Sequence, residues 1–147
     1  MPETLIVQAE MAELPRIRAW ADALSERLHI AHSVAFSIQL CLEEAFSNIV
    51  LYGFSDVEDS LDSNRDVHLV FEHDEETATI TIEDHGMPFD PLRRSEPAKP
   101  TSLDNAPIGG FGIHLMRHFA RAMTYERRDE LNHLTICFDL GASPTSA

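Results

Sequence analysis

The chain predicts an α+β fold, a two-layer sandwich in which helices cover one face of a mixed β-sheet. Two observations lead to this prediction: most strands come in hairpin pairs, and the first two helices follow each other directly. The expected order is strand, helix, helix, hairpin, long loop, helix, hairpin. A regular alternation of single strands and helices would instead indicate a parallel sheet.

The first half of the chain carries one strand and two helices. Residues 4–8 are β-branched and apolar, as in a short strand. Apolar residues recur at helical spacing over 13–28, which predicts an amphipathic helix. Residues 33–52 are apolar on more than one helical face, so this segment is expected to pack between other elements. Ser33 is expected to cap it and Gly53 to end it.

The second half predicts two hairpins. Apolar and polar residues alternate over 67–72 and 77–83, with a polar turn between them. The same pattern recurs over 122–127 and 133–139, with residues 129–132 as the expected turn. A helix is expected to begin near Gly112.

Length and composition predict one soluble domain. The chain has 147 residues, of which 1–141 are expected to fold together and 142–147 to form a disordered tail. No run approaches the roughly 20 apolar residues that a membrane helix needs, and no secretory signal opens the chain, so a cytoplasmic location is expected. The net charge of −14, with a single lysine, argues against direct binding to nucleic acid or an anionic membrane. Cys41 and Cys137 are expected to be buried free thiols.

Glu44 and Asn48 form the first candidate site. Residues four apart lie one turn apart on the same helix face. The glutamate could remove a proton from an attacking hydroxyl, and the asparagine could offer an oxygen to Mg²⁺. Many solvated helices carry the same pair, so the spacing alone does not define a site.

Two further motifs follow in order along the chain. Asp84 ends a strand, where its carboxylate could accept a hydrogen bond from an amino group, and Gly86 would let a planar ring approach the backbone. An ordinary turn with the sequence Asp-x-Gly, without a role in ligand binding, is the alternative interpretation of these residues. Gly109-Gly110-Phe111-Gly112 precedes a helix, and its N–H groups could bind phosphate, although a plain linker is the alternative.

Taken together, the three motifs resemble those of the GHKL superfamily of ATP-binding domains, and most closely the bacterial anti-sigma factor serine/threonine kinases. Residues 44–48 resemble the family's Glu-Ala-x-x-Asn box, 84–91 its adenine box and 108–117 its phosphate box. The resemblance extends over about residues 4–140. Tyr52 departs from it, because histidine is frequent at that place in the family.

The resemblance implies a histidine-kinase-like ATPase fold and a role for each matched residue. Glu44 would be the general base, and Asn48 would coordinate Mg²⁺. Asp84 would bind the adenine amino group of ATP or ADP, with Gly86 beneath the ring and Thr135 supporting the contact. The remaining implied ligands are the N–H groups of two glycines, Gly110 and Gly112, at the phosphates.

The resemblance also implies a lid and protein partners. Residues 87–108 would cover ATP, and any of Arg93, Arg94 and Lys99 could meet the phosphates. The implied activity is Mg²⁺-ATP-dependent phosphorylation of an anti-sigma factor antagonist by a homodimer that also sequesters a sigma factor.

Two rival functions share most of these residues. A nucleotide-gated binding module without kinase activity would need every motif except the base, and Glu44 favours catalysis over it. The ATPase half of a sensor histidine kinase is disfavoured, because no phospho-acceptor helix precedes the first predicted strand.

Overall fold

The computed structural model describes residues 2–53, 64–88, 90, 92 and 112–141. Several predictions fall outside this range. They concern the phosphate-binding role of Gly110, most of the lid over 87–108, its basic residues Arg93, Arg94 and Lys99, and the tail 142–147.

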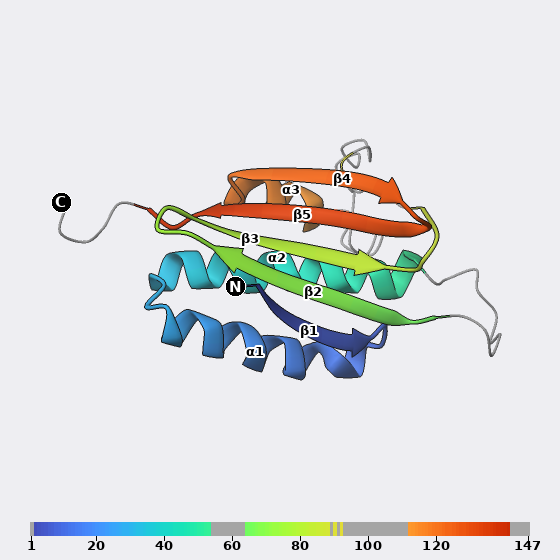
Figure 1. Ribbon diagram of the computed structural model, residues 1–147, viewed down its shortest axis with the longest axis horizontal. Coiled ribbons are helices and arrows are strands. Elements are labelled where there is room, and N and C mark those ends of the chain that lie inside the picture. The colour runs from blue at the N-terminus through green and yellow to red at the C-terminus, as the bar shows by residue number, and fades with distance from the viewer. Residues whose placement is uncertain (1, 54–63, 89, 91, 93–111, 142–147) are drawn as a thin grey trace, which may run out of the picture.

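In the part of the chain that the structure describes, five strands form one sheet, with helices packed on one face (Figure 1). The strands are β1 (Glu3–Gln8), β2 (Asp66–His73), β3 (Thr77–Asp84), β4 (Ala122–Arg128) and β5 (Leu131–Asp139). Their order across the sheet is β1-β2-β3-β5-β4, and all four described pairings are antiparallel. The α+β sandwich is confirmed, but the expected mixed sheet is wrong: β1 runs antiparallel to β2, so no parallel pair arises among the described strands.

The second layer contains, among the described residues, three α-helices: α1 (Leu14–Arg27), α2 (His32–Asn48) and α3 (Gly112–Phe119). A short 3₁₀ turn, Met11–Glu13, precedes α1, and a π-helical turn, Ile49–Gly53, continues α2. The expected cap at Ser33 is wrong. The N-cap position is Ala31, without a side-chain cap, and the Ser33 carbonyl instead accepts a bond from the Ser37 hydroxyl.

The core lies between the sheet and the helices and draws on both. Alternate residues of the central strands are buried against α2, as the twofold repeat of a strand requires. Ile80 and Ile82 of β3 face the helices, whereas Thr79 and Thr81 belong to the outer face. Both cysteines are free thiols; Cys41 is buried, as predicted, whereas Cys137 is only half-buried, because on β5 it alternates with the buried Ile136 and Phe138.

The segment His32–Gly53 corrects one sequence expectation. It is a helix long and apolar enough to cross a membrane by length and composition, with a mean hydropathy of 1.4 over its best window. In this fold the same apolar residues pack against the sheet, α1 and α3, with Phe46 fully buried. Its composition therefore reflects a helix that contacts neighbours on several sides.

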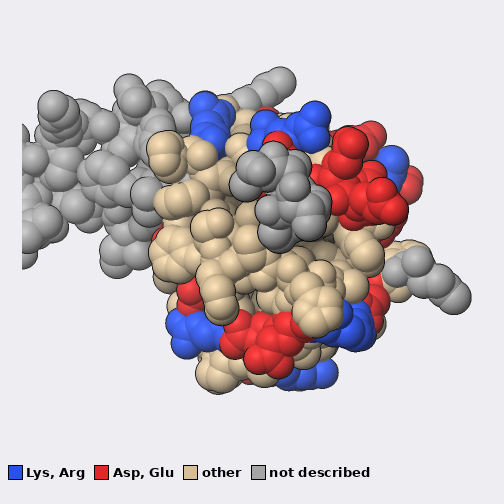
Figure 2. All heavy atoms as spheres, turned by 90° about the vertical axis from the view of Figure 1, so that its left-hand side faces the viewer, with Lys and Arg blue, Asp and Glu red and all other residues tan. Residues whose placement is uncertain are grey.

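Charge is dispersed over the end of the molecule where α1 passes into α2. Figure 2 shows this end, with uncharged atoms in the middle and both acidic and basic side chains around them. Phe36, 60% exposed, contacts Phe119 edge-on at 6.0 Å between ring centroids. On this face the described basic side chains stand among acidic ones, in keeping with the net charge of −14.

Candidate nucleotide-binding site

The candidate site lies at the opposite end of α2, where β3 also ends and β5 begins (Figure 1). Eight residues line a pocket of about 380 Å³, including the solvent at its mouth. They come from α2 and its π turn, from the end of β3 and from the β4–β5 hairpin: Ala45, Asn48, Ile49, Gly53, Asp84, Tyr125, Asn132 and Leu134.

Asp84 is the acidic group of the pocket and is only 3% exposed. Its Oδ1 accepts hydrogen bonds from the Gly86 backbone N–H at 2.8 Å and from Asn132 Nδ2 at 3.0 Å. Burial raises the pKa of this carboxyl, while the two donors and the Arg127 charge oppose that rise. Because both donors occupy Oδ1, Oδ2 can accept a bond from a ligand.

Gly86 stands where no side chain would fit. A Cβ at this position would lie 2.8 Å from Asp84 Oδ1 and 2.8 Å from the Gly53 carbonyl oxygen. The next residue, Met87, donates its N–H to that same Gly53 carbonyl at 2.8 Å. The turn after β3 is therefore fastened to the π turn after α2, and the glycine permits this approach.

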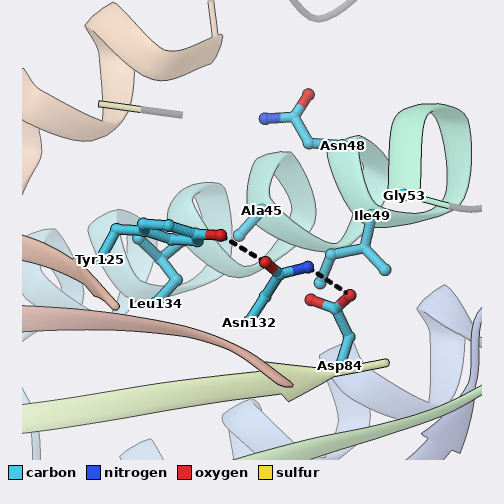
Figure 3. Close-up of a pocket in the computed structure, with 8 residues that line it drawn as sticks. All are labelled: Ala45, Asn48, Ile49, Gly53, Asp84, Tyr125, Asn132 and Leu134. Atoms are coloured by element: carbon cyan, nitrogen blue, oxygen red, sulfur yellow. Dashed lines mark hydrogen bonds between the residues drawn. The ribbon is translucent and has the colours of Figure 1, made fainter. Parts of the chain in front are cut away.

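Asn48 closes α2 and is the least satisfied polar side chain of the pocket. It is 3% exposed, and neither its Oδ1 nor its Nδ2 finds a hydrogen-bond partner among the described residues. Figure 3 shows its amide pointing away from Asp84 and Asn132, on the other side of α2. A buried amide without partners is costly, and a ligand or cation that supplies partners would offset that cost.

Glu44 lies one turn before Asn48 on α2 and is half-buried. Burial raises the pKa of its carboxyl, and the neighbouring charge of Glu43 raises it further. Glu43 itself pairs with Arg18 of α1, so the two adjacent glutamates have different surroundings. A carboxylate with a raised pKa accepts a proton more readily near neutral pH, as a general base must.

Thr135 requires a correction, because the structure does not bring it to this pocket. It pairs with Thr81 across the β3–β5 ladder, and the two hydroxyl oxygens are 3.4 Å apart on the outer face of the sheet. Asp84 and Leu134 belong to the inner face. A residue one position out of phase on a strand faces the wrong side, so Thr135 cannot support a contact made by Asp84.

Asn132 is the pocket residue that the sequence interpretation missed. The turn was expected over 129–132, but it contains only Asp129 and Glu130, both with positive φ. Asn132 is consequently a strand residue, and it lies directly opposite Asp84 in the register. The pairing of the end of one predicted strand with the start of another would have been the signal for it.

Of the two glycines predicted to bind phosphate, the structure describes only the backbone of Gly112, which begins α3. Nearby, Arg117 of α3 donates a hydrogen bond to the Leu92 carbonyl, and the Asp90 carboxylate accepts one from the Leu92 N–H at 2.8 Å. Leu92, one of the described residues of the segment after Gly86, is therefore attached to α3. Within the described residues, no cluster of three histidine, cysteine or carboxylate side chains could hold a metal by itself.

The fold, with helices on one face of the sheet, is that of a known class of ATPase domains. Residues 7–138 match the family model of the histidine kinase-like ATPase domain, and the chain belongs to that family. The resemblance drawn from the three motifs is thereby confirmed. Among relatives, the chain is 34% identical over 117 residues to the serine/threonine-protein kinase BtrW of Bordetella bronchiseptica, covering 80% of this chain and 79% of BtrW.

A solved structure supports the fold. The crystal structure of the RsbU and RsbW domains of Rv1364c from Mycobacterium tuberculosis aligns with 94% of this chain at a TM-score of 0.64. The sequence identity is 11%, so this likeness concerns the fold alone. This chain covers about a third (32%) of the chain in that crystal structure.

Proposed function

We propose that this chain is a Mg²⁺-ATP-dependent protein serine/threonine kinase of the anti-sigma factor type. The observation that carries the proposal is that one site contains both a buried acceptor, Asp84, and an unsatisfied buried amide, Asn48. The amide lies one turn from Glu44 on α2. Membership of the histidine kinase-like ATPase family supports nucleotide use, and the likeness to BtrW supports protein phosphorylation.

In this proposal each residue has a separate task. Asp84 Oδ2 accepts a hydrogen bond from the adenine amino group, and Gly86 leaves room for the ring. The N-terminus of α3, with Gly110 and Gly112 before and at it, offers N–H groups to the phosphates of ATP or ADP. Glu44 takes the proton of the attacking serine or threonine hydroxyl.

Asn48 is the protein group that would hold Mg²⁺. Its buried amide lacks partners among the described residues, and a carboxamide oxygen is a suitable ligand for a hard cation. When bound, Mg²⁺ would neutralise phosphate charge during transfer. Asn48 itself is neutral, so most of the remaining ligands must come from the phosphates and water.

The biological setting belongs to the same proposal. The substrate would be an anti-sigma factor antagonist, and the protein would also bind a sigma factor, act as a homodimer and work in the cytoplasm. The net charge of −14 disfavours direct binding to nucleic acid, so no such partner is part of the proposal.

Phosphate transfer is the direct test. The purified protein would be incubated with Mg²⁺, γ-³²P-ATP and the small antagonist-type proteins encoded near it. Label on a partner serine or threonine is expected, and Glu44→Gln should reduce it by about 100-fold or more with nucleotide affinity retained. Glu43→Gln is the matched control, since Glu43 pairs with Arg18, and it should still transfer phosphate.

The other results separate the rival functions. ATP binding with no label on any partner would favour the nucleotide-gated binding module. Failure to bind ATP at all would refute the assignment of the pocket. Equal labelling by wild type and Glu44→Gln would remove Glu44 as the base but leave the kinase in place.

A further inference from the structure

Asn132 is held at the centre of a hydrogen-bond network that joins β4, β5 and the turn after β3. Its Nδ2 donates to Asp84 Oδ1 at 3.0 Å and to the Met87 carbonyl at 2.9 Å. Its Oδ1 accepts a hydrogen bond from the Tyr125 hydroxyl. The residue is 5% exposed, so these partners replace water. Figure 3 shows Tyr125, Asn132 and Asp84 in line.

The partners determine which way the amide faces. A carboxylate and a carbonyl lie on one side of it, and both can only accept hydrogen bonds, so the NH₂ group must face them. The amide oxygen must then face the Tyr125 hydroxyl, which can donate. An amide turned the other way would set its oxygen against two acceptors.

This orientation makes Asp84 an acceptor. Its Oδ1 receives the donors from Asn132 and Gly86, which favour the ionised carboxylate against the effect of burial and leave Oδ2 to accept a hydrogen bond from a ligand. A second bond reinforces the arrangement: Arg127 Nη1 donates to the Gly86 carbonyl at 2.8 Å. The β4–β5 hairpin therefore holds both the carboxylate and the backbone turn in place before any ligand arrives.

We propose that Asn132, oriented by Tyr125, is the positioning residue that keeps Asp84 a hydrogen-bond acceptor and thereby makes the pocket select adenine over guanine. The inference rests on the proposed nucleotide site and deepens it. Adenine presents an amino group where guanine, bound in the same orientation, presents a carbonyl oxygen. Two facing acceptors repel each other, so an ionised Asp84 favours the first base and disfavours the second.

The charges around Asp84 give the network a pH-dependent signature. Arg127 of β4 and His85 of the turn favour the ionised carboxylate, whereas α2 and its π turn contribute only uncharged groups to the pocket lining. Desolvation already raises the pKa of Asp84, and the Asn132 donor opposes this rise. Loss of that donor must raise the pKa further, so that adenine binding weakens as the pH falls.

The test measures the dissociation constants of ribose-labelled fluorescent ATP and GTP analogues from pH 6 to pH 8.5. Asn132→Asp has nearly the same shape but places a second carboxyl beside Asp84, and the pair is expected to retain a proton. Its ATP affinity should fall about 10-fold or more, most at low pH, and its preference for ATP over GTP should shrink.

Tyr125→Phe keeps the amide but releases its orientation, and it covers the case in which Asn132→Asp does not fold. It should weaken ATP binding by about 3-fold. Its preference for ATP over GTP should also shrink, but less than in Asn132→Asp. Thr135→Val is the matched control, because Thr135 is on the same strand but on the outer face. It should leave both affinities and the pH profile unchanged.

Distinct results would overturn the inference and the function beneath it. If Asn132→Asp and Tyr125→Phe both keep the wild-type ATP/GTP ratio and pH profile, Asn132 does not set the selectivity, while the nucleotide site stands. If the wild type binds neither analogue, the nucleotide site fails and this inference fails with it.

Discussion

Replacing Asn48 by leucine should stabilise the nucleotide-free protein while removing its response to Mg²⁺-ATP. The side chain is buried, and both of its polar atoms lack hydrogen-bond partners among the described residues. Leucine branches at the same carbon as asparagine but has no polar atoms to desolvate. The substitution therefore removes a cost of the folded state and creates little empty space.

The magnitude follows from the burial of the amide. An unsatisfied buried polar group costs about 1–3 kcal/mol, and leucine also has the better helix propensity by about 0.5 kcal/mol. A net gain of about 2 kcal/mol is expected. For a chain of 147 residues this corresponds to an increase in Tm of roughly 6 °C.

Thermal unfolding with and without Mg²⁺-ATP is the assay. At about 100 times its Kd a ligand stabilises the wild type by about 2.7 kcal/mol, and the Mg²⁺-dependent part of this shift should vanish in Asn48→Leu. Asn132→Leu is the matched comparison. This second buried asparagine is fully engaged, so its replacement should destabilise the protein by removing one of the two donors to Asp84 and the Asn132 donor to the Met87 carbonyl.

Opposite signs for the two asparagines are therefore the expected result. If Asn48→Leu lowers the Tm of the nucleotide-free protein, the Asn48 amide has partners that stabilise the fold, and the reasoning from its unsatisfied atoms is refuted. If the variant keeps the full Mg²⁺-dependent shift, Asn48 does not hold the cation.

Two further predictions concern the acidic end of the pocket. Gly86→Ala should lower the free energy of unfolding by about 1–3 kcal/mol and weaken ATP binding, because its Cβ would meet both Asp84 and the Gly53 carbonyl. Urea unfolding measures the stability and calorimetry measures the ATP affinity. If neither value changes, the close contacts at Gly86 are not as described. Asp84→Asn should raise stability at neutral pH and abolish ATP binding. The folded-state pKa of Asp84 is raised, so wild-type stability falls as the pH rises from the unfolded value of about 3.9 through the folded pKa. The variant should lack that part of the pH dependence in urea titrations, and an unaltered profile would show that Asp84 does not carry the shift.

The periodicity of apolar residues was sufficient to predict the helices and strands, but not to predict which face of the sheet each strand residue occupies. The helical repeat identified α2, and alternation identified both hairpins, because burial on one side imposes those repeats. Which residues of β5 face inward depends on where the turn between β4 and β5 ends. The observed turn is two residues shorter than expected, so Asn132 lies in the strand. Thr135 was assigned from its place in a motif, but register decides which face a side chain occupies.

The pairing of β1 and the end of α2 depend on contacts distant in sequence. Nothing local to residues 4–8 specifies that β1 pairs with β2, so the mixed sheet was a reasonable but wrong expectation. The π turn after Asn48 is joined to the β3 end by the bond between the Gly53 carbonyl and the Met87 N–H. Such a turn is frequent at functional sites, yet helix propensity does not reveal it.

Three polar groups of the candidate site, Asp84, Glu44 and Asn48, have a common property that links stability to binding. Burial raises the pKa of Asp84 and of Glu44, and Asn48 is buried without partners among the described residues, so each group is less favourable in the nucleotide-free protein than a neutral or apolar replacement. An amino group at Asp84 and a cation at Asn48 would supply what these side chains lack. Because the Gly53–Met87 bond joins the ends of α2 and β3, a ligand that satisfies both sides would also stabilise this junction. Nucleotide binding should therefore protect the backbone amides of Ile49–Gly53 from hydrogen exchange together with that of Met87, and protection of one segment without the other would show that the two are not coupled.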